Sequence, residues 1–90
     1  MTAEGIETPL RILFARRQIF IGDFWAGQAY RDAHAGNRAE FLRLRKILDR
    51  LPGPVLAAVD SVVLHEEMPR NPRLIDLLSE GLDALFQQMQ

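Results

Sequence analysis

Cysteine is absent from this sequence of 90 residues. Its absence excludes disulfide bonds and thiolate metal sites, and it fits a reducing compartment. No apolar run approaches the roughly 20 residues that a membrane span requires, and residues 1–8 lack the basic segment of a signal peptide. We therefore expect a cytoplasmic protein without a membrane partner. It should form a single domain over residues 1–90, in which residues 1–8 are a flexible N-terminal segment.

Residues that support metal binding or catalysis are also scarce. The two histidines, His34 and His65, lack a second imidazole at metal-ligand spacing. Asp60, Glu66 and Glu67 are near one another in sequence, but a carboxylate acid–base pair needs a desolvated cleft that separates the two pKa values. Neither a glycine-rich phosphate loop nor a serine in a nucleophile elbow is present. The sequence therefore predicts no enzyme activity, no metal site and no cofactor.

Apolar residues make up 48% of the chain and charged residues 26%, which is the composition of a globular protein. The net charge of −1 provides no overall attraction to nucleic acid. The charges are nevertheless unevenly distributed, because residues 1–50 hold nine Lys and Arg against six Asp and Glu, whereas residues 51–90 hold two against six. This asymmetry has two interpretations: a bipolar binding surface, or charges that complement each other within the fold or between subunits.

Periodic apolar residues predict an all-α fold, a compact bundle of about five short helices. Proline follows Thr8, Gly53 and Asn71, where it takes the first helical position and its missing N–H costs nothing. Thr8 and Asn71 are also favourable N-caps. The predicted helices span residues 9–17, 24–35, 38–51, 55–68 and 72–89.

Two joints between these helices carry turn signals. Gly22 and Asp23 indicate a turn and cap before the second helix, while the apolar run 19–21 is too short to assign. Gly36 is a natural stop for the second helix and Asn37 a natural cap for the third.

Basic residues concentrate on the third predicted helix. Helical spacing places three of them on one stripe and two on a neighbouring line. A cluster of this kind can bind the phosphates of DNA. The alternative is a solvated face on which Glu40 and Asp49 pair with some of the positive charges. The five residues are Arg38, Arg43, Arg45, Lys46 and Arg50.

The last two predicted helices have the spacing of a helix-turn-helix, with residues 68–71 as the turn. A recognition helix reads base edges through its N-terminal half, and Arg70, Asn71 and Arg73 have suitable side chains. Carboxylates farther along the helix would be repelled by phosphates. The pair therefore has two interpretations: a plain antiparallel hairpin, or a degenerate helix-turn-helix that no longer reads DNA.

Three aromatic residues lie close together at the first joint between helices: Phe20, Phe24 and Trp25. In so small a protein they are candidates for the core. The alternative is an exposed docking patch or dimer interface.

Two blocks of sequence resemble a known helical pattern. Residues 16–20 (Arg-Arg-Gln-Ile-Phe) and 26–31 (Ala-Gly-Gln-Ala-Tyr-Arg) are similar to short bacterial and phage-like regulator domains related to helix-turn-helix proteins. Residues 77–85 are similar to the closing helix of the same group. Gln18 stands where that pattern has glycine. The resemblance implies a transcription-linked or phage-linked regulatory role.

Two functions follow as expectations. The first is a small regulatory protein that acts on transcription by contacting DNA, or a DNA-bound partner, through its basic helix face. The alternative is a protein–protein interaction module, an adapter or homodimer that binds no nucleic acid.

Overall fold

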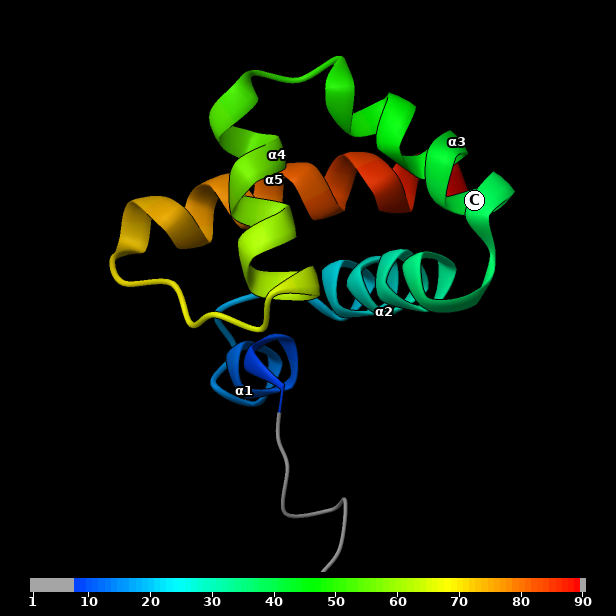
Figure 1. The fold of residues 1–90 in the computed structure, drawn as a ribbon. Helices are drawn as coiled ribbons and strands as arrows, with labels where there is room; N and C mark the ends of the chain where they lie inside the picture. Colours follow the sequence, from blue (N-terminus) through cyan, green and yellow to red (C-terminus); the bar gives the residue numbers. More distant parts are fainter. Residues whose placement is uncertain (1–7, 90) are drawn as a thin grey trace, which may run out of the picture.

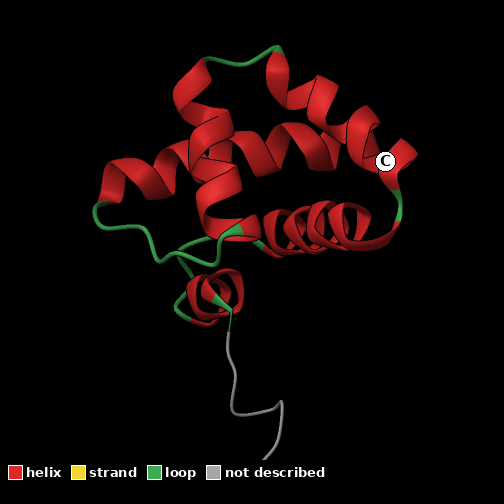
Figure 2. Cartoon of the chain, in the orientation of Figure 1, coloured by secondary structure: helices red, strands yellow, loops and turns green. Residues whose placement is uncertain are grey.

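A computed structural model describes residues 8–89, and within that range the chain is helical with no strand (Figures 1 and 2). The predicted all-α fold is therefore confirmed. The elements are α1 (Pro9–Ala15), α2 (Ile21–Gly36), α3 (Arg38–Asp49), α4 (Gly53–Val59), the π-helical segment η2 (Asp60–Leu64) and α5 (Pro72–Met89).

Three helices begin as the sequence predicts. The side-chain oxygens of Thr8, Asn37 and Asn71 each accept a hydrogen bond from the backbone N–H three residues farther along, at 3.2, 3.1 and 3.0 Å respectively. These bonds satisfy N–H groups that lack a partner inside the first helical turn. Thr8 is thus placed as a cap, while the expectation of flexibility for residues 1–7 lies outside the described range.

The predicted start of the second helix is wrong. Gly22 and Asp23 lie within the first turn of α2 rather than in a turn before it. Asp23 is buried and accepts hydrogen bonds from the backbone N–H of Phe20 at 3.4 Å and from the hydroxyl of Ser79 at 2.9 Å. Gly22 packs so closely on α5 that an added Cβ would lie 3.0 Å from the Phe86 ring. Both residues therefore serve the contact between α2 and α5.

The first helix ends two residues earlier than predicted, at Ala15. Arg17 has a φ of 60°, and the N–H of Gln18 donates to the carbonyl of Leu13 at 2.9 Å. This is the Schellman arrangement, in which the left-handed position usually holds glycine.

The predicted end of the fourth helix and the turn after it are also wrong. α4 widens into η2 at Asp60, and the helical path ends at Leu64 instead of residue 68. The N–H of His65 closes η2 on the carbonyl of Asp60 at 3.0 Å, and Glu66 follows with a φ of 56°. Residues 65–71 therefore connect η2 to α5 as a seven-residue segment rather than a four-residue helix-turn-helix joint.

α5 is the central element of the core, since it contacts α2, α3 and α4. Gly81 permits the close approach of α4, because a Cβ there would lie 2.5 Å from Val59 and 2.9 Å from Val55. On the other side of α2, Gly27 gives room to Leu10 of α1 in the same way. Figure 1 shows α2 and α3 beside α5, with α1 beyond α2.

Candidate functional site

Three large apolar side chains at the start of α2 are exposed to solvent. Their exposed fractions are 79% for Phe20, 60% for Ile21 and 56% for Trp25. Phe20 is the N-cap residue, Ile21 is the first residue of α2, and Trp25 lies one turn farther along. We call these three residues the α2 patch. Single exposed apolar residues are ordinary, whereas a group of them marks an interaction surface.

Phe20 fits neither of the roles that its position would normally have. An N-cap side chain usually accepts a hydrogen bond from the first helical turn, and a phenyl ring has no acceptor. Asp23 caps from the opposite direction, by accepting the N–H of Phe20. Because Phe20 neither caps α2 nor enters the core, its benzyl group is available to a partner.

Phe24 differs from its two aromatic neighbours, because it packs against the core. Its ring stacks on Phe14 of α1 with centroids 4.9 Å apart, and it contacts Trp25 edge-on at 5.4 Å. Of the three aromatic residues selected from the sequence, one is therefore partly buried against the core and two are exposed. The contact with Phe24 restricts the motion of the Trp25 ring. The ring therefore loses less entropy when a partner binds.

The α2 patch lies between two other helices. Gly27 and Phe24 face α1, through Leu10 and Phe14, whereas Gly22 faces α5 through Phe86. Because successive residues turn by about 100° around a helix, Ile21 and Trp25 share the outward line between these two contact faces. α1 and α5 therefore border the patch on opposite sides.

These two borders carry opposite charges. Arg16 and Arg17 are exposed at the end of α1. Glu80 and Asp83 are exposed on α5. Burial is the main cause that raises the pKa of Asp23, and the nearby charge of Asp83 adds a smaller increase. Exposed basic groups therefore end the helix on one side of the patch, and exposed acidic groups lie on the helix on its other side.

The five basic residues predicted on the third helix do not share one face. Arg43 points to solvent but binds Glu40 through two hydrogen bonds of 2.9 and 2.6 Å, which hold the pKa of Glu40 below its usual value. Arg45 is half-buried, and its guanidinium lies 3.6 Å from a carboxylate oxygen of Asp60. Three basic residues on α3 or at its C-cap are exposed without a carboxylate within ion-pair distance among residues 8–89: Arg38, Lys46 and Arg50.

The contact of Arg45 belongs to a network that joins α2, α3 and η2. The hydroxyl of the fully buried Tyr30 donates to Asp60 at 2.7 Å. Burial, and next the hydrogen bond to Asp60, raise the pKa of Tyr30, so this hydroxyl keeps its proton. Arg45 is therefore a structural partner of Asp60, and sequence spacing gave no signal for this long-range contact.

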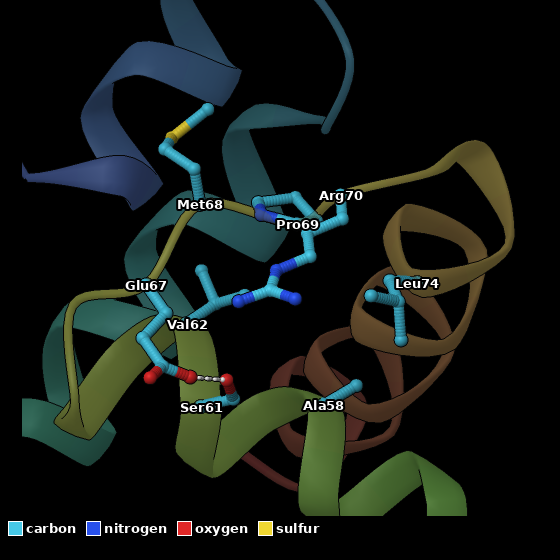
Figure 3. Close-up of a pocket in the computed structure, with 8 residues that line it drawn as sticks. All are labelled: Ala58, Ser61, Val62, Glu67, Met68, Pro69, Arg70 and Leu74. Atoms are coloured by element: carbon cyan, nitrogen blue, oxygen red, sulfur yellow. Dashed lines mark hydrogen bonds between the residues drawn. The ribbon is translucent and has the colours of Figure 1, made fainter.

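The three residues predicted to contact bases lie at the other end of α5 from α3 (Figure 1). Asn71 uses its side-chain oxygen to cap α5, and Arg73 is exposed in the first turn. Arg70 extends its guanidinium into a cavity of about 370 Å³, between Val62 and Leu74 (Figure 3). In that cavity the hydroxyl of Ser61 donates to the carboxylate of Glu67. The predicted DNA-binding residues thus form two separate groups.

No group of three His, Asp or Glu side chains in residues 8–89 is arranged to hold a metal ion. None of the helices there combines the length and apolarity needed to cross a membrane.

Comparison with protein-family models, with curated proteins and with solved structures found no match.

Ile21 is the member of the α2 patch that sequence reasoning missed. The available signal was an apolar residue, Phe20, immediately before it at a position where a helix start normally has a polar cap.

Proposed function

We propose that this protein is a protein-interaction module whose binding surface is the α2 patch. The observation that carries the proposal is the joint exposure of Phe20, Ile21 and Trp25 on one helix start. Aromatic side chains on a supported surface are the residues that dominate binding energy at protein interfaces. Such a module suits an adapter or a regulatory protein that acts through a bound partner.

The energetic argument concerns the apolar area that remains in water. Complete burial of a side chain such as Phe or Ile stabilises by about 1.5–3 kcal/mol relative to exposure. Each of the three patch residues keeps more than half of its surface exposed. A partner that covers all three therefore gains several times the thermal energy, enough for a central interface cluster.

Site-specific photo-crosslinking in producing cells tests the proposal. A photoreactive residue replaces Ile21 in one variant and Leu42 in a control. Leu42 is 48% exposed on α3, so the two positions are similarly accessible. We expect discrete adducts from position 21 and none from position 42. The same diffuse products from both positions would overturn the proposal.

A second substitution links the adducts to the patch. Phe20→Ser removes the exposed ring and supplies a favourable N-cap, so the fold should be retained while the adducts from position 21 disappear. Circular dichroism and thermal unfolding verify that this variant is folded. Adducts that persist at full yield in the folded variant would contradict a role for Phe20.

A second candidate function rests on the three exposed basic residues of α3, Arg38, Lys46 and Arg50, which are suited to contact phosphates of nucleic acid. Affinity for random duplex DNA would then fall with salt, since each neutralised phosphate contributes about −0.9 to the slope of log K against log salt. Fluorescence anisotropy measures this slope for the parent protein and for Lys46→Ala with Arg50→Ala. Equal and salt-insensitive values would eliminate this candidate. A role in transcription regulation stays a prediction, which requires either this DNA binding or a DNA-bound partner of the α2 patch.

A further inference from the structure

We infer that the partner of the α2 patch is a second copy of this chain, docked about a two-fold axis that runs along α2. The inference rests on the proposed function of the patch and adds the identity and orientation of the occupant. In a two-fold dimer the same surface meets itself, so the surface must be self-complementary.

The apolar part of the patch meets this requirement. Ile21 and Trp25 lie on the outward line of α2, with Phe20 at its beginning. An axis along α2 sets the two helices side by side and parallel, so each patch residue meets its own counterpart near the axis. The three side chains of each copy then cover those of the other.

The charges on α1 and α5 favour this axis, and they outnumber the one like-charge pair that it brings together, Asp32 with its own counterpart two turns beyond Trp25. Rotation about a line along α2 places the α1 border of one copy over the α5 border of the other. Arg16 and Arg17 then face Glu80 and Asp83 across the interface, twice in each dimer. An axis across α2 would instead set α1 against α1 and α5 against α5, which brings like charges together. Charges at the rim of an interface mainly determine orientation and exclude wrong pairings.

The chain provides its own reporter of this contact, because Trp25 is its only tryptophan. Burial of Trp25 shifts its emission to shorter wavelength and protects it from acrylamide. We expect sedimentation velocity, from about 1 μM to about 1 mM, to show the mass rising from 10.3 kDa toward twice that value. The emission shift should follow the same concentration dependence.

Two variants tie self-association to the patch. Phe20→Ser should weaken the dimer at least about tenfold, the effect of losing one central apolar contact, whereas Leu42→Ser should leave the dissociation constant unchanged. A monomer at every concentration, or a dimer indifferent to Phe20→Ser, would overturn the inference. In the monomer case, adducts between position 21 and a different protein would leave the proposed function standing.

Charge reversal tests the orientation. One chain carries Arg16→Glu and Arg17→Glu, and a second carries Glu80→Lys and Asp83→Lys. Each alone should dimerise more weakly than the parent chain, and an equimolar mixture should form heterodimers beyond the statistical half. The parent dimer should also weaken as salt increases. An undiminished dimer of the first variant, or parent affinity that increases with salt, would contradict an axis along α2.

Discussion

The starts of α2 and α5 each need an acceptor for a free backbone N–H group, and they provide it in different ways. At α5, Asn71 occupies the N-cap and its side chain accepts the N–H of Leu74. At α2, Phe20 occupies the N-cap, and the capping acceptor is the buried Asp23, which also binds Ser79 of α5. Asn71 is therefore engaged within its own chain, whereas the side chain of Phe20 is free for a partner. A side chain with the chemistry to contact a base can instead be engaged in capping its own helix. An apolar residue at a cap position is the more informative indication of a binding surface.

The largest expected difference between the two helix starts concerns Asp23. Asp23→Ala removes the cap of α2 and the partner of Ser79 together, so we expect a loss of about 2 kcal/mol in the free energy of unfolding. Chemical denaturation measures it. Asp32→Ala, an exposed aspartate on the same helix, is the matched control and should change stability by less than about 0.5 kcal/mol. Equal losses in the free energy of unfolding for the two variants would show that Asp23 contributes no more than an exposed aspartate.

The cap of α5 should contribute less. Asn71→Ala removes one exposed capping bond, and the expected loss is about 1 kcal/mol. Arg73→Ala in the same turn should be close to neutral, since its side chain forms no ion pair within residues 8–89. Denaturant titration of both variants checks this order. An Asn71 effect as large as that of Asp23 would abolish the contrast between the two helix starts.

Replacement of Phe20 should stabilise the single chain slightly. Serine at the N-cap accepts a hydrogen bond that phenylalanine cannot, which predicts a gain of about 0.5–1 kcal/mol for Phe20→Ser. Thermal unfolding is measured at low protein concentration, where self-association does not contribute. Phe24→Ser, which removes a ring packed against the core, should instead cost about 2 kcal/mol or more. A loss of monomer stability in Phe20→Ser would show that the ring serves the fold itself.

The smallest effect is a pH dependence that originates at Asp23. Burial raises the pKa of Asp23 above its ordinary value of 3.8, while the hydrogen bonds from Ser79 and Phe20 oppose the shift. The folded state therefore binds this proton more tightly than the unfolded state. Its stabilising contribution is complete below pH 3.8 and is lost as the pH rises through the higher folded pKa. The free energy of unfolding should therefore decrease as the pH rises through this range, and Asp23→Asn should remove that decrease. An identical pH profile in the variant would contradict the shift.

Features governed by neighbouring residues were predictable. Thr8, Asn37 and Asn71 each bond to a backbone group three residues away, so the sequence alone identifies these helix starts. The helical class follows equally from the period of the apolar residues. Gly22 and Asp23 failed as turn formers because their contacts, Phe86 and Ser79, come from a helix more than fifty residues later.

The candidate site shows the same division. Exposure of Phe20 and Trp25 was one of two open interpretations, and packing against α1 separated Phe24 from them. The spacing of Arg45 placed it among phosphate contacts, but its guanidinium is paired with Asp60 of η2.

The sequence by itself determined the helical class, three of the capped helix starts, the absence of disulfides and the opposite charges of the two halves of the chain. Only the tertiary structure decided that α4 ends in a π-helical turn, that residues 65–71 form a long connection, and that the α2 patch lies between a basic and an acidic border. The physical reason is range. Capping and helical period act within about four residues, whereas exposure depends on which helices pack against each face.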